Sequence, residues 1–406
     1  MKQRMHIVML TRVLPHHSIG GMQAIAWDLA RAFVRNGNKV TVVTTEVVGR
    51  HVRFVEDGVH VIALPKISWR RYGSRWWRES RRVFLRELAT DCDALLSVSA
   101  AGFGLLALKA AFPDIPFVLQ AHGTSLGEVR SKWKTRRPMA LLSSLRNLAY
   151  LCRDIFYFPH FDAITAVGQA VADDLQAVPI CWKLDSKLVH VIPNGIDSEH
   201  FRPDAASGQK LRESMGWRGV KVIVSASRLH RQKGVHLGLD AFSLLEKMQE
   251  DVRFLIVGDG PERHALEAHA EKLGLAHKVH FTGAISRDQL PQYLQAADVM
   301  LFTTTRVEGL PMNVLEALAV GLPAVVSEHL FQNDSLAENS NIFRVEQASA
   351  VAVAHAMERA LKQSMSKESA LPHEYSLAKC ATTYLELFNK ISTRNAVMSK
   401  ADSSNA

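Results

Sequence analysis

Strand-like segments alternate with helical segments along most of this chain. Residues 6–10 and 39–45 have strand patterns, and a helical pattern over residues 22–36 lies between them. In the second half, the stretches KVIVSASRLHRQKG, RFLIVGDGPERHAL and KVHFTGAISRDQL each read as a strand, a loop and the start of a helix. A strand–helix unit that recurs every roughly 25 to 35 residues builds parallel sheets covered by helices. We therefore expect an α/β protein.

The segment FRPDAASG has the composition of a linker and separates two groups of these units. A chain of 406 residues is long enough for two or three domains. We expect two Rossmann-like domains, at residues 1–200 and 201–375. An amphipathic helix should follow at residues 376–393, and the polar residues 394–406 should form a disordered tail.

The net charge of +9 is confined to the first half of the chain. Residues 1–200 contain 26 Lys+Arg and 17 Asp+Glu, whereas the remaining residues contain 23 of each. Such an asymmetry indicates an acidic partner for the first half, such as a nucleic acid, an anionic lipid or a phosphorylated substrate.

The most basic stretch, residues 66–86, has eight basic residues, one acidic residue and interleaved aromatic residues. Aromatic rings anchor at lipid headgroups and cations are attracted to anionic lipid, so we expect contact with an anionic membrane surface. A second basic run at residues 130–137 precedes an amphipathic stretch and fits the same reading. A solvated basic helix with buried tryptophans and a nucleic-acid site are the alternatives, the latter less favoured. The side chains expected at the membrane are Trp76, Trp77, Arg78, Arg81 and Arg82.

Neither a secretion signal nor a membrane-spanning helix is expected. No stretch reaches about 18 uninterrupted apolar residues, and the apolar start is too short for a signal peptide. The four cysteines are widely separated, which favours free thiols in a reducing compartment such as the cytoplasm.

No metal site or redox cofactor is expected either. Asp91 and Asp93 precede their strand and so face the wrong end of the sheet for a substrate-bound metal. Arg263 stands where a dinucleotide fingerprint after Gly258 would need its third glycine.

Charged side chains follow several predicted strands. Glu308 and Glu316 flank a turn and the first turns of a helix, whose N-terminus carries partial positive charge. Arg228 and Lys233 lie on the loop after another strand and can contact phosphate as cations. Ligands of open α/β sheets bind beyond the carboxyl ends of the strands, so we expect these side chains to line a crevice. A capped helix with solvated glutamates, and a solvated basic loop, are the alternatives.

Two further positions lie at expected strand ends in the first half. His122 and Thr124 follow the strand FVLQA. Gly20 and Gly21 precede the first helix, where backbone amides can approach a phosphate.

Five motifs together carry a family resemblance. The sequences IPNGID, SRLHRQKG, VGDGP, VHFTG and VEGLPMNVLEALAVGLP occur in this order and cover nearly the whole second half. The chain resembles the retaining glycosyltransferases of the glycogen-synthase-like, group 1 family. That resemblance implies the GT-B architecture, in which two Rossmann-like domains face an interdomain cleft and the last helix crosses back to the first domain.

The family's functional residues can be transferred one by one. The resemblance implies catalytic roles for His122, Glu308, Arg228 and Lys233. It implies that the sugar donor is bound by Gly21, Arg228, Lys233, Glu308, Gly309, Leu310, Met312, Glu316, Ala284 and Ile285, with Thr124 towards the acceptor. It also implies transfer with retention and without a metal, and we favour a front-face route because no carboxylate nucleophile is evident in the first half.

Two departures limit what the resemblance implies. Many family members have the sequence E-G-F-G, whereas this chain has Leu310 and Pro311 at the third and fourth positions. Proline removes an N–H that would bind a sugar hydroxyl, so the identity of the sugar is not transferred. The stretch SEHLFQND also lacks the common Gly-Gly turn.

The expected function is transfer of a sugar from a UDP- or GDP-sugar to a lipid-linked glycan in cell-surface polysaccharide or lipopolysaccharide synthesis. The expected location is the cytoplasm, on the inner face of the membrane. The alternatives are a catalytically silent GT-B fold that acts as a membrane-associated partner, and a nucleotide-sugar epimerase or phosphorylase.

Overall fold

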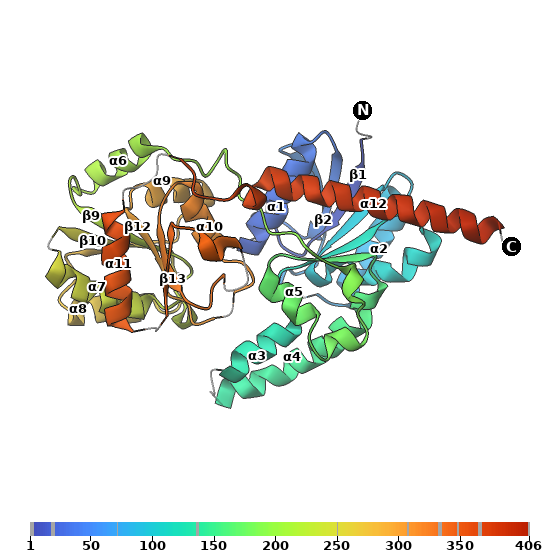
Figure 1. Ribbon diagram of the computed structural model, residues 1–406. Coiled ribbons are helices and arrows are strands. Elements are labelled where there is room, and N and C mark those ends of the chain that lie inside the picture. Colours follow the sequence, from blue (N-terminus) through green and yellow to red (C-terminus); the bar gives the residue numbers. More distant parts are fainter. Residues whose placement is uncertain are drawn as a thin grey trace. The chain divides into compact units, whose positions relative to one another are not determined.

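The chain folds into two compact units, each built around a sheet of mainly parallel strands (Figure 1). The computed structural model describes residues 4–17, 21–70, 72–134, 138–249, 251–306, 308–331, 335–346, 349–363 and 368–404. Unit 1 comprises Met1–Gly195 and Leu377–Ala406, and unit 2 comprises Ile196–Ser376. The chain therefore leaves unit 1 close to residue 200 and returns to it for its last helix.

Unit 1 has a sheet of order β3-β4-β2-β1-β5-β6-β7-β8. Neighbouring strands are parallel except for the antiparallel pair of β3 and β4. The strands are β1 (His6–Leu10), β2 (Lys39–Thr45), β3 (Arg53–Glu56), β4 (Val59–Leu64), β5 (Ala94–Val98), β6 (Phe117–Ala121), β7 (Ala163–Ala166) and β8 (Val189–Val191). Because β2 and β5 lie on opposite sides of β1, the strand order reverses between β1 and β5.

Helices cover both faces of this sheet. The α-helices are α1 (Gly21–Arg35), α2 (Ser74–Val83), α3 (Ser125–Lys134), α4 (Pro138–Tyr157), α5 (Gln169–Leu175) and α12 (Leu377–Ser404). Short helical segments are η1 (Phe84–Leu88), η2 (Ser99–Ala111), η3 (Phe158–His160), η4 (Ile180–Trp182) and η5 (Ser186–Leu188).

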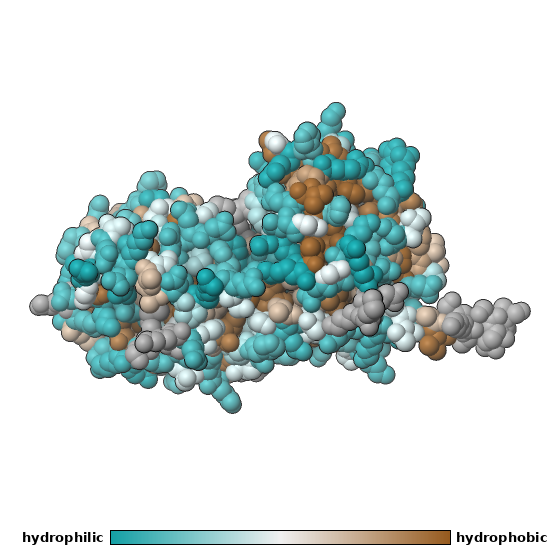
Figure 2. Space-filling model, turned by 90° about the horizontal axis from the view of Figure 1, so that it is seen from above, coloured by the Kyte–Doolittle hydropathy of each residue, from teal (hydrophilic) through white to brown (hydrophobic). Residues whose placement is uncertain are grey.

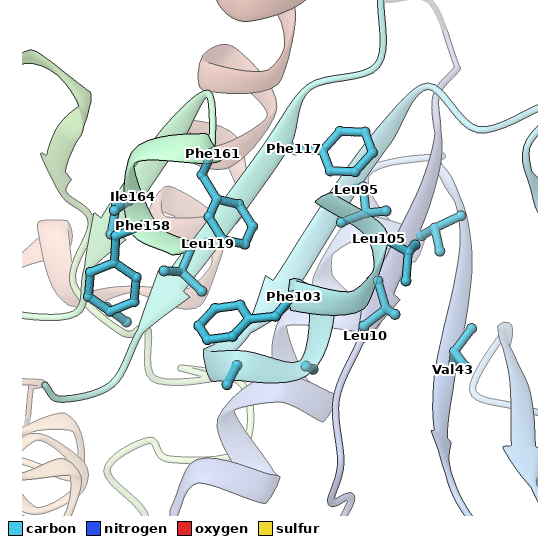
Figure 3. Close-up of a cluster of buried hydrophobic side chains, with 14 of the residues drawn as sticks. Leu10, Val43, Leu95, Phe103, Leu105, Phe117, Leu119, Phe158, Phe161 and Ile164 are labelled. Atoms are coloured by element: carbon cyan, nitrogen blue, oxygen red, sulfur yellow. The ribbon is translucent and has the colours of Figure 1, made fainter. Parts of the chain in front are cut away.

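The core of unit 1 lies on the two faces of the sheet. Successive side chains of a strand point to opposite faces, so Val8 and Leu10 join one cluster while Ile7 and Met9 join the other. Figure 3 shows the first cluster, in which Phe103 packs among side chains from several strands. Burial on both faces explains why these strands are continuously apolar.

Helix α12 packs on unit 1 through a row of aromatic rings. The rings of Tyr384 and Phe388 lie 6.2 and 6.1 Å from that of Phe33 on α1. The expectation of a disordered tail from residue 394 is wrong for the described residues, because α12 continues to Ser404. Residues 392–404 contain neither glycine nor proline, and an established helix gains one hydrogen bond for each residue it adds.

Unit 2 has a sheet of order β11-β10-β9-β12-β13-β14, in which neighbouring strands are parallel. The strands are β9 (Lys221–Ala226), β10 (Val252–Val257), β11 (Val279–Gly283), β12 (Val299–Phe302), β13 (Ala324–Ser327) and β14 (Ile342–Val345). The helices are α6 (Ala205–Ser214), α7 (Val235–Met248), α8 (Arg263–Lys272), α9 (Leu290–Gln295), α10 (Met312–Ala319) and α11 (Ala350–Lys362), with short segments η6 (Arg231–Lys233), η7 (Arg287–Gln289), η8 (Ser335–Glu338) and η9 (His373–Tyr375). Here the strand order reverses between β9 and β12.

The surface is mostly hydrophilic in the view of Figure 2, with one broad hydrophobic area on that face. Among the described residues, no helix is both long enough and apolar enough to cross a membrane.

The antiparallel helices α3 and α4 lie side by side as a hairpin (Figure 1). Trp133 of α3 donates a hydrogen bond through its indole N–H to the hydroxyl of Ser144 on α4, at 3.1 Å.

Candidate functional site

The reversal of strand order between β9 and β12 creates the position in unit 2 where a ligand of an open α/β sheet binds. Arg228 and Lys233 lie on the loop after β9, and Glu308 lies on the loop after β12. The structure therefore brings three of the sequence-predicted residues to the same edge of the sheet.

Lys233 and Glu308 form an ion pair at this edge. Lys233 Nζ lies 2.8 Å from Glu308 Oε1, and the side chains are 24% and 16% exposed. The hydroxyl of Thr304 donates to the same oxygen at 3.4 Å, and the ammonium lies 5.2 Å from the centre of the Phe302 ring. The pair is thus partly removed from water, which strengthens its attraction over that of an exposed pair.

Arg228 differs from Lys233 in having no such partner. Its side chain is exposed and forms no ion pair with any described residue. The guanidinium therefore remains available to an anion at the carboxyl end of β9.

Gly234 holds the lysine loop against the next strand. Its φ of 74° lies in the left-handed region, and a Cβ built on it would overlap the carbonyl oxygen of Thr303. The hydroxyl of Thr303 donates to the carbonyl of Gly234 at 3.0 Å. Only glycine fits here, and its presence fixes the position of Lys233 next to the end of β12.

The second predicted carboxylate, Glu316, is almost completely buried on α10. It is 4% exposed, and its Oε1 accepts a hydrogen bond from Arg287 Nη1 at 3.0 Å. The Arg287 guanidinium also lies 5.3 Å from the centre of the Phe201 ring. This arginine lies two residues beyond Ile285, on the loop predicted to flank the donor, while Ala284 is exposed and Ile285 is half-buried.

Sequence reasoning missed Arg287 and Asn313. Ser286 and Gln289 form a capping box, which places Arg287 at the first position of η7. The spacing of Ser286 and Gln289 is visible in the sequence and could have indicated this short helix. Asn313 Nδ2 donates to the carbonyl of Ala226 at 3.0 Å and so joins the start of α10 to the end of β9. No local pattern indicates that contact.

The turn before α10 presents backbone amides. Helix α10 begins at Met312, and Pro311 is its N-cap residue. The N–H groups of Gly309, Leu310 and Met312 donate to no acceptor in the described part of the chain. The Leu310 and Met312 side chains pack against the core of unit 2, so these amides are what the turn offers to a ligand.

In unit 1, His122 directly follows β6 and is half-buried. Burial lowers its pKa to about 4, so the ring is neutral at neutral pH. Its Nε2 lies 3.1 Å from Oε1 of the buried Gln120. Because Nε2 donates to that oxygen, Nδ1 is the acceptor that remains for a hydroxyl group.

Thr124, which is expected to lie towards the acceptor, holds the start of α3 with its side chain. Its side chain is 4% exposed; the hydroxyl donates to Asp174 Oδ2 at 3.0 Å and accepts from the amide of Gly127 at 2.9 Å. The start of α3 therefore uses this hydroxyl. Gly21 begins α1, whereas Gly20 lies outside the described residues.

Of the two tryptophans expected at a membrane, Trp76 is buried and Trp77 is half-buried. Trp76 is 1% exposed and donates its indole N–H to the carbonyl of Ala101 at 2.9 Å. Trp77 is half-buried and donates to the carbonyl of Ala100 at 3.3 Å. An amphipathic helix buries its aromatic face, so α2 packs through these rings on η2. The arginines of its other face, Arg78, Arg81 and Arg82, are exposed.

No group of three or more histidine, cysteine, aspartate or glutamate side chains within the described ranges is arranged to hold a metal ion.

Two family models match the chain. The model of the glycosyl transferases group 1 matches residues 209–375, and that of the Glycosyltransferase Family 4 matches residues 19–200. These two segments lie within unit 2 and very nearly within unit 1, respectively.

Curated relatives match over part of their length. The mannosylfructose-phosphate synthase of Agrobacterium fabrum is 33% identical over 157 residues, which are 36% of this chain and 34% of that protein. The GDP-mannose-dependent alpha-(1-6)-phosphatidylinositol monomannoside mannosyltransferase of Mycolicibacterium smegmatis is 36% identical over 146 residues, which are 34% of this chain and 38% of that protein. The matches therefore span about a third of the length of these relatives.

Solved structures match over almost their whole length. A glycosyltransferase from Rickettsia africae has a TM-score of 0.71 at 17% identity and covers 96% of this chain and 98% of its own. Anabaena Alr3699/HepE, in complex with UDP and glucose, has a TM-score of 0.63 at 19% identity and covers 99% of this chain and 100% of its own. At these identities the similarity is one of fold.

Proposed function

We propose that this chain, which has the GT-B fold, is a group 1 glycosyltransferase that transfers a hexosyl group from a UDP- or GDP-sugar to a glycan with retention of configuration. The observation that carries the proposal is the Lys233–Glu308 pair at the point where the strand order of unit 2 reverses. Arg228 lies on the same loop as Lys233, is exposed and forms no ion pair with the residues that the structure describes. The names of the relatives support both nucleotides, since one is GDP-mannose-dependent and another structure contains UDP.

The charges of this site suit a nucleotide sugar. Negative charge grows on the diphosphate as the glycosidic bond breaks, and cations placed beforehand lower the barrier most where charge develops. Arg228 and Lys233 supply two cations, which we infer do the work that a metal ion does in other enzymes. Glu308 accepts hydrogen bonds from hydroxyl groups of the donor sugar, and Glu316 from those of the ribose.

We infer a front-face reaction. At the end of β6 the chain has His122, whose lowered pKa keeps it neutral, where a covalent intermediate would need a carboxylate. A neutral imidazole can bind a sugar hydroxyl through Nδ1 without forming a bond to the anomeric carbon. The departing phosphate then accepts the proton of the acceptor hydroxyl.

We further propose that the acceptor is lipid-linked and that unit 1 contacts an anionic membrane surface, as in the assembly of a cell-surface glycan. Arg78, with a 72% exposed side chain, lies with Arg81 and Arg82 on the free face of α2. The hairpin of α3 and α4 exposes Trp133 (55%) and Phe156 (64%). Exposed arginines and aromatic rings are the side chains that bind at headgroup level.

The donor site is tested by binding and by turnover. We expect the preferred nucleotide among UDP, GDP and ADP to give the largest increase in melting temperature. Lys233→Ala should lose most of this shift and most of the turnover of the matching nucleotide sugar. Lys362→Ala is the matched control, because Lys362 forms a pair with Glu358 at the same 2.8 Å but on the exposed surface of α11.

Three results would decide against the proposal. Unchanged turnover in both Lys233→Ala and Glu308→Ala would remove the site from the reaction. Nucleotide binding without any turnover would indicate a silent GT-B fold. A changed sugar nucleotide formed without an acceptor would indicate an epimerase.

The membrane contact is tested separately by liposome flotation at low salt, with and without anionic lipid. Reversal of the charges of Arg78, Arg81 and Arg82 to glutamate should release the protein. Reversal at Arg218, which is 81% exposed in unit 2, serves as the control. If the triple arginine variant and the Arg218 variant floated equally with anionic liposomes, the proposed membrane contact would be contradicted.

A further inference from the structure

Two arginines of unit 1 that take no part in the sites above lie near the point where its strand order reverses. Arg12 follows β1 by two residues, and Arg153 of α4 lies 5.4 Å from the ring of Phe103, in the segment after β5. Ligands of open α/β sheets bind where the strand order reverses, which in unit 1 is between β1 and β5. His122 follows β6, the next strand along.

The Tyr72 ring packs against Arg12, and its hydroxyl reaches Val98 at the end of β5, the strand that leads into the segment beside Arg153. The Arg12 guanidinium lies 4.8 Å from the ring centre. Burial raises the pKa of the Tyr72 phenol to about 12, while the charges of Arg12 and Arg153 both oppose this rise. The pKa of this one phenol is therefore affected by both positive charges.

The surrounding contacts hold the two guanidinium groups in place. The Tyr72 hydroxyl donates to the carbonyl of Val98 at 3.2 Å, and Arg12 Nη1 donates to the carbonyl of Arg70 at 3.1 Å. Arg153 lies 4.8 Å from the centre of the Tyr150 ring. Aromatic rings and carbonyls position these cations but leave their charge in place.

Little negative charge is available to neutralise them. In the described ranges Arg12 forms no ion pair, and the partner of Arg153 is Asp154 at 3.5 Å. Asp154 also accepts from the amide and the hydroxyl of Ser125, at 3.3 and 2.6 Å, and burial raises its pKa. The cluster thus has an excess of positive charge.

The hydrogen-bonding groups of the arginines are also incompletely used. The Nε atoms of Arg12 and Arg153 are buried without an acceptor in the described structure, an arrangement that native proteins rarely keep without a function. Nη2 of Arg12 and Nη1 of Arg153 likewise have no acceptor there, and both residues are only half-buried. Each guanidinium therefore keeps one accessible donor.

We propose that Arg12 and Arg153 form an oxyanion-binding subsite, and that the acceptor of the transferred sugar carries a phosphate or carboxylate group that binds there. The planar donors of arginine match both anions, whose oxygens accept two parallel hydrogen bonds. The identification of this ligand as an acceptor rests on the proposed glycosyl transfer. The binding of an oxyanion by the two arginines does not.

Calorimetric titration at low ionic strength tests the subsite directly. The probes are inorganic phosphate, glucose 6-phosphate, glucuronate and glucose. We expect the three anions to bind and glucose to bind at least tenfold more weakly. Arg12→Gln and Arg153→Gln should each weaken anion binding at least tenfold, whereas Arg86→Gln, which removes another exposed arginine of unit 1, should not. Whichever of glucose 6-phosphate and glucuronate binds with the higher affinity indicates whether the acceptor carries a phosphate or a carboxylate group.

The same variants distinguish acceptor from donor. UDP and GDP should bind them as they bind the wild-type protein, and this result would stand even if no glycosyl transfer were found. Loss of nucleotide affinity in both variants would assign the arginines to the donor diphosphate and overturn the proposal. Equal phosphate affinity of wild-type and doubly substituted protein, or no phosphate binding at all, would also overturn it.

A measurement on the wild-type protein covers the case in which the variants do not fold. Phenylglyoxal modifies accessible arginines, and peptide mapping reports the rate at each position. Phosphate should slow the modification of Arg12 and Arg153 at least fivefold and leave that of Arg86 unchanged. Equal protection at all three positions would contradict a specific subsite.

Discussion

Replacement of Glu308 by glutamine should separate binding of the nucleotide from transfer of the sugar. Glu308 holds Lys233 at 2.8 Å in the structure, yet the proposed reaction needs Lys233 on the diphosphate. The bound nucleotide must therefore compete with Glu308 for the ammonium. Glutamine keeps the size of the side chain and removes the charge that competes.

Two opposite effects of Glu308→Gln follow, and both have a magnitude. Release of a partly buried ion pair removes a competing interaction of about 1 kcal/mol, so the nucleoside diphosphate should bind about fivefold more tightly. Loss of a charged acceptor for a donor hydroxyl costs about 1.5–3 kcal/mol, which lowers kcat by about 10- to 150-fold. Lys233→Met should instead weaken nucleotide binding, and the double variant should show no gain from Glu308→Gln.

The assay combines calorimetric titration of the nucleotide with steady-state kinetics on the matching nucleotide sugar. Glu358→Gln is the control, because Glu358 pairs with Lys362 at the same distance on an exposed helix; it should leave both quantities unchanged. A Glu308→Gln enzyme that keeps the wild-type kcat, or that binds the nucleotide more weakly, refutes the reasoning.

Three further predictions concern stability. Gly234→Ala should lower the melting temperature by several degrees, because it adds backbone strain at φ 74° and a clash with a backbone carbonyl. Gly216→Ala is the control: Gly216 has φ 69° and no neighbour within 4 Å, so this variant should lose only the strain energy, about 1–2 kcal/mol. Tyr384→Phe removes a buried 2.7 Å hydrogen bond with Thr165 and should lower the free energy of unfolding by about 1 kcal/mol in denaturant titrations. His122 has a folded pKa of about 4, below its ordinary value of 6.5, so unfolding takes up a proton between these values. The free energy of unfolding should therefore fall, by up to about 3 kcal/mol, as pH is lowered through this window, and His122→Asn should lack that loss.

The fold was predictable to a large extent because its signals are local. Each strand and helix is recognisable from a few neighbouring residues, because apolar residues recur at a different spacing in a strand than in a helix. The tail shows where such reasoning fails: the polar composition of residues 394–404 indicated disorder, yet these residues continue α12. Composition does not reveal that a preceding helix is already anchored on a core and needs no new nucleus.

The site was predictable in its charged residues but not in their connections. Glu308, Arg228 and Lys233 follow strands, and this placement is visible in the sequence. Arg287 stood within a predicted loop, but its contact with Glu316 over 29 positions had no local signal.

The basic stretch of α2 shows the opposite outcome. Tryptophans next to arginines suggested one surface, but a helix divides them between two faces, and Trp76 is buried while Arg78 is exposed.

The sequence by itself determined the alternation of strands and helices, the order of the motifs, and the charged residues placed at strand ends. Only the tertiary structure decided that Lys233 meets Glu308 across 75 positions, and that the Arg12 guanidinium packs on the ring of Tyr72 while that of Arg153 packs on the ring of Phe103. The physical reason is that periodicity arises from residues one or two turns apart. Pairing between distant loops depends instead on the order of strands in the sheet, and that order is set by the burial of both faces of the sheet at once.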